Sequence, residues 1–196
     1  PSGRLPVLLC DGAAIAWELW AIFELAGERL PQLWPADPLE RARARAVVAE
    51  ASALVAFQTY LPMDFVGRFA PPAILLRPVE REAARLRAIW TECRQRTGDR
   101  GLFLFGDFGL VDAVMVPLAA RFRTYGLPLS AVEKQYVDTV LSLDAVLFWE
   151  QQARAEREGA ETPQPAWLSK GAEPAGRPAA PAPTVALPSG IVAAEV

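Results

Sequence analysis

The stretch FLFGDFGLVDAVMVPLAARFRTYG, residues 103–126, is the part of this 196-residue chain that says most about its fold. A run punctuated by glycines, residues 103–109, leads into an apolar segment from Leu110 to Phe122. The apolar side chains of that segment recur at helical spacing around most of the helix, at Leu110, Val111, Val114, Met115 and Leu118. A helix that is apolar on most sides must be covered by neighbours, so the stretch predicts the buried centre of a helical domain.

Helical patterns continue on both sides of this segment. They predict one helix from Leu39 to Tyr60, ending or kinking at Pro62, and another from Val79 to Arg96. Two more follow, one capped by Ser130 with Glu133 completing a capping box, the other starting near Asp144. Five helices with short connections indicate a bundle, which we expect to span residues 39–157.

The chain before and after the bundle has a different character. Residues 1–31 predict a strand at 5–9, a turn at Asp11-Gly12, a second strand at 13–16 and a helix from about Trp17 to Arg29. Two prolines and a capping Asp37 make residues 32–38 a linker. Residues 158–196 are rich in Pro and Ala without apolar periodicity, so we expect a disordered tail.

Composition excludes several classes of function. The chain has no histidine, which removes Ser-His-Asp and Cys-His nucleophiles and every His-ligated metal site. A net charge of −3 argues against nucleic acid as a partner. Cys10 and Cys93 fit no CxxC pattern and indicate reduced, buried thiols. The glycines of residues 98–109 form no phosphate-binding loop, and no carboxylate cluster predicts a metal.

A few local patterns have plain structural interpretations. The apolar stretch 13–26 is interrupted by Glu18 and Glu24 well short of a bilayer span, which predicts no membrane association and a cytoplasmic protein. The arginines at 41, 43 and 45 indicate a solvated helix face with acidic partners such as Glu40. The acids Glu80 and Glu82 are expected on the surface of an exposed helix start.

Beyond composition, a series of motifs resembles the glutathione S-transferase family of cytosolic, bacterial type. The motifs occur in the family's order and spacing over about residues 2–155: GRLPVL at 3–8, WELWAI at 17–22, LWPAD at 33–37, LPM at 61–63, FLFGDF at 103–108 and RFRTYG at 121–126. The resemblance implies a mostly α protein: a partial thioredoxin-like domain that keeps a β-β-α remnant, followed by the family's all-helical C-terminal domain. It begins at the family's third strand.

The resemblance also implies a glutathione site. Leu5, which precedes Pro6, would pair through its backbone with the cysteinyl part of glutathione, and Glu18 would face the γ-glutamyl amino group. The family's serine after that acid is replaced by Leu19, which removes a hydroxyl donor to the γ-glutamyl carboxylate. Gly109 stands where the family has a capping Ser or Thr, so Gly109→Ser is expected to stabilise the following helix slightly, and Asp112 is expected to be a buried cap.

Two functions remain open at this point. In the first, the complete protein is a homodimeric glutathione transferase that conjugates glutathione to a small electrophile. The family's thiol-activating residue lies in a first strand-helix unit that the sequence lacks, so we expect this chain to contain no catalytic residue, to need no metal and to be inactive by itself. In the second, the chain is a non-catalytic dimerisation or scaffold module. The upstream reading frame would discriminate between them, and strand 5–9 is expected to be an exposed apolar edge.

Overall fold

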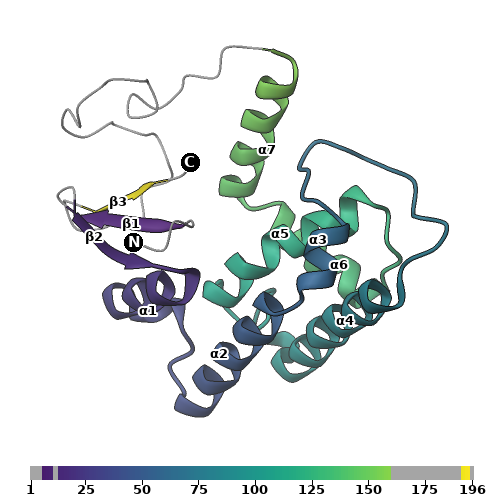
Figure 1. Cartoon of the computed structure of the whole chain (residues 1–196). Helices are drawn as coiled ribbons and strands as arrows, with labels where there is room; N and C mark the ends of the chain where they lie inside the picture. Colours follow the sequence, from purple (N-terminus) through teal and green to yellow (C-terminus); the bar gives the residue numbers. More distant parts are fainter. Residues whose placement is uncertain (1–5, 11–12, 160–190, 195–196) are drawn as a thin grey trace. The chain divides into compact units, whose positions relative to one another are not determined.

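The computed structural model describes residues 6–10, 13–159 and 191–194. They divide into two compact units: unit 1 comprises residues 1–31 and 155–196, and unit 2 comprises residues 32–154. Most of the described residues lie in helices (Figure 1), which confirms the expected mostly α fold class.

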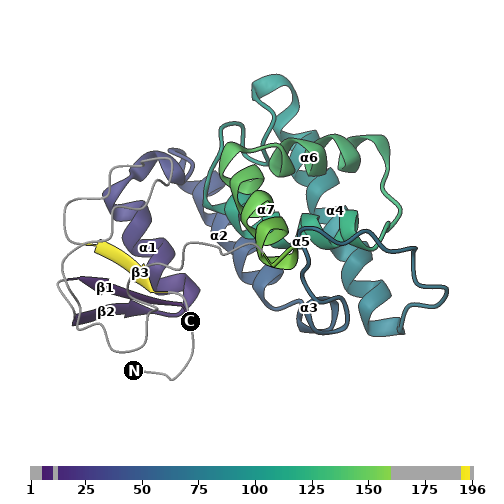
Figure 2. The same ribbon diagram turned by 90° about the horizontal axis from the view of Figure 1, so that it is seen from above.

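Unit 1 contains a small antiparallel sheet and one helix. Its elements are β1 (Val7–Cys10), β2 (Ala13–Trp17), α1 (Leu19–Arg29) and β3 (Ile191–Ala194), with the strands in the order β2-β1-β3 (Figure 2). The helix α1 contacts β2. Cys10 pairs with Ala13, so the predicted turn residues 11–12 connect the two strands, but they lie outside the described residues.

A bulge shapes the pairing of β1 with β2. Leu8 lies opposite Ala16 and Leu9 lies opposite Ala14, so Ile15 is an extra residue on β2. Leu8 and Ala16 are both buried, whereas Ile15 is largely exposed. The buried pair therefore forms the inner face of the sheet.

The structure corrects three expectations for unit 1. Trp17 belongs to β2 rather than to the helix, because the backbone turns sharply at Glu18 before α1 starts at Leu19. The strand predicted at 5–9 is not an exposed edge, since β1 is paired on both sides. Residues 191–194 form a strand although the tail was expected to be disordered. Residues 160–190 of that tail lie outside the described residues.

Unit 2 is a helical bundle. Its helices are α2 (Pro38–Ser52), α3 (Val55–Tyr60), α4 (Arg77–Thr97), α5 (Leu110–Thr124), α6 (Ala131–Leu141) and α7 (Asp144–Arg157, whose last residues belong to unit 1), with the short 3-10 turns η1 (Pro31–Leu33) and η2 (Gly98–Arg100). The predicted central helix is confirmed: α5 contacts both α2 and α6, and most of its residues are buried.

Aromatic packing defines the core of unit 2. Trp90 of α4 and Phe122 of α5 have ring centroids 4.9 Å apart, and both side chains are almost fully buried. Phe57 of α3 lies 5.3 Å from Phe122, and Tyr136 of α6 lies 5.8 Å from Trp90. Four helices thus meet at one aromatic cluster, which makes large-to-small changes there costly.

The helix predicted from 39 to 60 is two helices, α2 and α3, separated at Ala53 and Leu54. Glu82 of α4 explains the break, because its carboxylate accepts a hydrogen bond of 2.7 Å from the backbone N–H of Phe57. A first-turn N–H of α3 is thereby satisfied without a continuous helix. Glu82 is therefore half-buried and structural, which corrects its assignment to the surface.

The helix caps predicted at Asp37 and Ser130 are confirmed. Asp37 accepts hydrogen bonds from the N–H groups of Leu39 and Glu40, at 3.0 and 2.8 Å. Ser130 and Glu133 form the expected capping box at α6: each side chain accepts from the other residue's N–H, at 3.4 and 2.6 Å. Such caps satisfy N–H groups that have no partner within the helix.

Asp112 is the buried cap that the sequence predicted at α5. Its carboxylate accepts from the N–H groups of Leu104 (3.2 Å) and Gly109 (3.0 Å) and from the hydroxyl of Tyr136 (3.0 Å). Burial nevertheless raises the pKa of Asp112 to about 6, and the three donors offset only part of that effect. The Tyr136 hydroxyl, fully buried, has its pKa raised well above the ordinary value, chiefly by desolvation.

Gly109 is required for a reason that the sequence did not reveal. A Cβ atom at this position would lie 2.8 Å from the backbone carbonyl oxygen of Leu33. The expectation that Gly109→Ser would stabilise α5 is therefore wrong, because the hydroxyl could be gained only by displacing the chain at η1.

The arginines of α2 and the nearby cysteine have structural surroundings. Arg43 pairs with Glu40 at 2.6 Å, as expected, while the Arg41 guanidinium donates to two carbonyls of the 32–38 segment. Arg45 lies over the ring of buried Trp34, 5.6 Å from its centroid. Cys93 of α4 is half-buried, and desolvation raises its pKa to about 11, so its thiol stays protonated at neutral pH.

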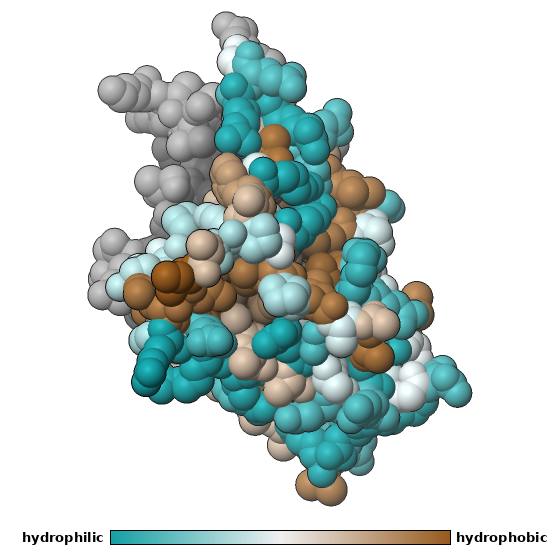
Figure 3. Space-filling model, turned by 90° about the vertical axis from the view of Figure 1, so that its right-hand side faces the viewer, coloured by the Kyte–Doolittle hydropathy of each residue, from teal (hydrophilic) through white to brown (hydrophobic). Residues whose placement is uncertain are grey.

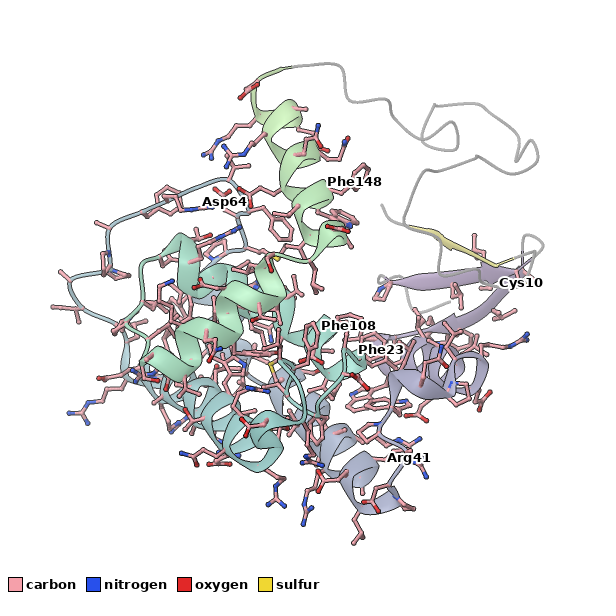
Figure 4. The ribbon with its side chains drawn as sticks, turned by 180° about the vertical axis from the view of Figure 1, so that it is seen from behind. Cys10, Phe23, Arg41, Asp64, Phe108 and Phe148 are labelled. Carbon is pink, nitrogen blue, oxygen red and sulfur yellow. The ribbon has the colours of Figure 1, made fainter. Side chains whose placement is uncertain are left out.

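One ion-pair network at α7 was missed by sequence reasoning. Glu150 contacts three guanidinium groups, from Arg154 at 2.6 Å, Arg123 at 2.9 Å and Arg68 at 3.5 Å. Arg68 lies on the loop that begins at Asp64, which Figure 4 shows close to α7. Burial acts to raise the pKa of Glu150, but the arginines outweigh it and the pKa lies below its ordinary value.

The surface of unit 2 mixes charged and apolar side chains. On the face shown in Figure 3, apolar residues gather in patches between hydrophilic ones. The large apolar residues of the 61–76 loop that are exposed include Ile74, Leu76, Phe69 and Met63. None of the described helices combines the length and apolarity that crossing a bilayer requires.

Candidate functional site

The junction of β2 and α1 contains the most unusual backbone in the described part of the chain. Glu18 adopts φ 70° and ψ 139°, and it is the only described residue other than glycine with a positive φ. A side chain with a Cβ atom costs roughly 1–3 kcal/mol in such a conformation. Strain of this kind is typical of functional sites, so Glu18 is a candidate on backbone grounds alone.

The side chain of Glu18 stays available for a ligand. It is exposed, and it makes no capping hydrogen bond to α1, although Glu18 occupies the N-cap position. The first turn of α1 contains no acidic residue. The first N–H groups of α1 and the positive end of its dipole therefore lie next to the Glu18 carboxylate, which does not cap the helix.

The sheet register brings the predicted site residues together. Val7 lies opposite Trp17, so Pro6 and Glu18, one residue further along each strand, lie at the same end of the β1-β2 pair. Leu19 is the first residue of α1 and is half-buried. Leu5 lies outside the described residues, so its predicted backbone contact stays a prediction.

Taken together, this end of unit 1 offers both halves of a receptor for an amino-acid group. A carboxylate binds an ammonium, and free N–H groups at a helix N-terminus bind a carboxylate. An α-amino acid moiety has both charges on one carbon. Leu19 supplies no hydroxyl to strengthen the second contact.

A group that activates a thiol is missing from the described part of unit 1. That part contains no Ser, Thr, Tyr, Lys or His, and Cys10 lies at the other end of β1 from Pro6. No group of three or more Asp, Glu or Cys side chains among the described residues is arranged to hold a metal ion.

Solved structures supply the comparison. A glutathione transferase homologue from Burkholderia gl BGR1, solved with bound glutathione, matches 77% of this chain and 73% of its own, with a TM-score of 0.56 and 21% identity. Glutathione transferase Omega 3C from Trametes versicolor matches 75% of this chain and 67% of its own, with a TM-score of 0.53 and 20% identity.

The chain has the glutathione transferase fold. No family model matches it, and no curated protein matches it significantly, so the likeness rests on structure. In the glutathione transferase fold of this chain, the β2-α1 junction is formed by Trp17, Glu18 and Leu19. The fold expected from the sequence motifs is confirmed, whereas the roles of individual site residues stay predictions.

Sequence reasoning missed the conformation of Glu18. The residue was selected by resemblance, and no spacing or composition signal marked its positive φ. One signal was present: a strand pattern and a helix pattern abut at Trp17-Glu18-Leu19 without a turn residue between them. An abrupt junction of this kind leaves a single residue, Glu18, to redirect the chain from the strand into the helix.

Proposed function

We propose that this chain belongs to a glutathione transferase in which unit 1 binds the γ-glutamyl end of glutathione at Glu18 and the N-terminus of α1. The complete protein would be a cytoplasmic homodimer that conjugates glutathione to a small electrophile. The observation that carries the proposal is the strained, exposed Glu18 beside an uncapped helix start, in a fold shared with a homologue that was solved with glutathione bound.

Each charged group of the γ-glutamyl end finds a complement. The Glu18 carboxylate accepts hydrogen bonds from the α-ammonium group, and the first N–H groups of α1 donate to the α-carboxylate. The backbone of Leu5, next to Pro6, pairs with the cysteinyl part. Because Leu19 lacks a hydroxyl, the α-carboxylate loses a hydrogen bond worth roughly 1.5–3 kcal/mol, which weakens binding at least about tenfold.

Conjugation itself needs a further group. The glutathione thiol must lose its proton, its sulfur then forms a bond to the electrophilic carbon, and the leaving group departs with the bonding electrons. A donor beside the sulfur would favour the thiolate. The described residues of unit 1 supply no such donor, so we propose that this chain binds glutathione weakly without accelerating conjugation.

Calorimetric titration with glutathione tests the proposal. We expect weak binding by the parent chain, tighter binding by at least about tenfold for Leu19→Ser, and binding too weak to detect for Glu18→Gln. The matched control is Glu28→Gln, an exposed acid in the last turn of the same helix, which should leave the affinity unchanged.

A modified ligand separates a specific contact from a general effect of charge. Glutathione acetylated on its α-amino group has no ammonium for Glu18, so parent and Glu18→Gln should bind it equally poorly. If folded parent and folded Leu19→Ser both fail to bind glutathione, the binding proposal is wrong. The non-catalytic dimerisation or scaffold function would then be favoured.

A further inference from the structure

The ion-pair network at α7 contains more positive than negative charge. The Glu150 carboxylate is in contact with three guanidinium groups, those of Arg68, Arg123 and Arg154. The carboxylate of Asp64, on the loop beside α7 (Figure 4), is the second acid whose charge acts on Arg68. Three positive groups thus face two negative ones. This excess is local, because the whole chain has a net charge of −3.

The two more exposed arginines converge on one atom. The Nη2 atoms of Arg68 and Arg154 lie 3.5 and 2.6 Å from the same oxygen of Glu150, Oε1. Their side chains are 43% and 50% exposed, whereas that of Glu150 is only 12% exposed. The pKa of Arg68 is lowered by desolvation and then by the charges of Arg123 and Arg154. The carboxylate is therefore mostly covered, while two neighbouring guanidinium groups that repel each other remain accessible to a dissolved anion.

Backbone carbonyls fix two of the guanidinium groups. Arg68 Nη1 donates to three carbonyls of its own loop, those of Phe65, Val66 and Gly67, at 3.0, 3.1 and 2.7 Å. Arg123 Nη2 donates to the Phe65 carbonyl at 3.3 Å, and its Nε is buried with no hydrogen-bond partner among the described residues. Side chains held in this way lose little freedom when an ion binds, which favours binding here over binding by loose surface arginines.

The loop that carries Arg68 is itself tied to the end of α5. The Asp64 carboxylate accepts from the N–H groups of Val66 and Gly67, both at Oδ1, and so holds the turn of the loop. Three side chains at the end of α5 donate to carbonyls at the start of the loop: Arg121 to Leu61, Tyr125 to Pro62 and Thr124 to Asp64. The loop, α5 and α7 together therefore set the positions of the three arginines.

We propose that Arg68, Arg123 and Arg154 form a binding site for a terminal phosphate group. Arg68 and Arg154 are its hydrogen-bond donors, and Arg123 adds part-buried positive charge. A phosphate group has three free oxygens, so it can accept from guanidinium groups of two different elements at once, and it balances the excess charge. Glu150 already supplies a carboxylate to the cluster. Because the site lies within unit 2, the inference is independent of glutathione binding at Glu18.

Phosphorus NMR titration at constant ionic strength tests the proposal. Inorganic phosphate and methyl phosphate are added separately to the full chain at pH 7, with sodium chloride adjusted to keep screening constant. We expect both to bind the parent, and Arg68→Gln and Arg154→Gln each to weaken binding at least about tenfold, because each removes a charge-assisted hydrogen bond. The matched control is Arg77→Gln, which removes the same charge at an exposed position in the first turn of α4 and should leave the affinity unchanged.

The outcomes separate a phosphate site from its alternatives, with the folding of each variant checked by far-UV circular dichroism. Binding of both phosphates that depends on Arg68 and Arg154 but not on Arg77 supports the proposal. It is overturned if the folded parent binds neither ligand, or if Arg77→Gln weakens binding equally, which shows a general effect of charge. Binding that Arg68→Gln and Arg154→Gln leave unchanged belongs to another part of the chain, such as the N-terminus of α1, and also overturns it.

Two further ligands define the class of anion. Acetate titrated in the same way should bind more weakly than methyl phosphate, because it offers only two oxygens. Equal affinity for acetate shows a carboxylate site and overturns the assignment to phosphate. Binding of inorganic phosphate without methyl phosphate shows a site for the free ion and overturns the assignment to a terminal phosphate group.

Discussion

Glu18→Gly should make the chain more stable and abolish its affinity for glutathione. Glu18 holds φ at 70°, and a residue with a Cβ atom loses roughly 1–3 kcal/mol there, whereas glycine adopts positive φ without that cost. Glycine also lowers folding stability by about 0.5–1 kcal/mol through the greater freedom of the unfolded chain. The net gain in the free energy of unfolding should be about 1 kcal/mol, or a rise in Tm of about 2–4 °C for a chain of this size.

Glu18→Ala is the matched control for this experiment. Alanine removes the carboxylate but keeps the Cβ atom, so the strain remains and no gain in stability is expected. Both variants should lose glutathione binding, because both lose the carboxylate that we propose as the partner of the ligand's ammonium group. The parent thus keeps a residue that lowers its stability, which is the relation expected where strain is retained for binding.

The assay combines urea unfolding, followed by far-UV circular dichroism, with calorimetric titration of glutathione. Two results would refute the reasoning. If Glu18→Gly is no more stable than Glu18→Ala, the backbone at this junction stores no strain. If Glu18→Gly is stabilised but binds glutathione as the parent does, the strain has no connection with the ligand.

Three further predictions concern unit 2. Because burial raises the pKa of Asp112 to about 6, the folded state holds this proton more tightly than the unfolded state, and the free energy of unfolding should fall as the pH rises from about 4 to about 6. In urea unfolding, the parent should lose up to about 3 kcal/mol of stability relative to Asp112→Asn over this pH range. If the stabilities of the two proteins change in parallel with pH, the prediction is wrong. Gly109→Ser should lower the free energy of unfolding by roughly 1–3 kcal/mol, because the new Cβ atom would clash with the Leu33 carbonyl oxygen. Thermal unfolding measures this, and an unchanged or higher Tm would show that η1 moves aside at no cost in stability. The pKa of Glu150 is lowered, so its contribution to stability is complete above about pH 4.5 and is lost progressively as the pH falls through the lowered value. Glu150→Gln should therefore cost about 1 kcal/mol at pH 7 and distinctly less at pH 3. An equal cost at both pH values would show that the pairing with Arg123 is not responsible.

The sequence predicted those parts of the fold that depend on local pattern. The helices α4, α5 and α6 follow from apolar spacing and from caps such as Ser130 with Glu133, because these signals lie within one element. The break between α2 and α3 was missed for the opposite reason. It depends on Glu82, 25 residues away from the N–H that it accepts from, and no window around residue 53 contains that information.

The same distinction explains the errors at single residues. Gly109 was interpreted as a weak N-cap, because capping preferences rank residue types at that position without regard to what packs against it. Its actual constraint is the carbonyl of Leu33, 76 positions earlier in the chain. The covering of β1 by β3 is more distant still, because the partner strand is at the other end of the sequence.

The candidate site shows how far resemblance and geometry support each other. Resemblance selected Pro6, Glu18 and Leu19 without any view of the backbone, and the β1-β2 register then placed the first two at one end of the hairpin. The positive φ of Glu18 is a separate observation, since nothing in the motif requires it. Leu19 is the position where this chain differs from the family that it resembles. The backbone N–H groups at the start of α1, which we propose bind the ligand carboxylate, are kept, but the hydroxyl that would add a hydrogen bond is absent. Restoring that hydroxyl in Leu19→Ser is therefore the most direct way to learn whether the junction still recognises glutathione.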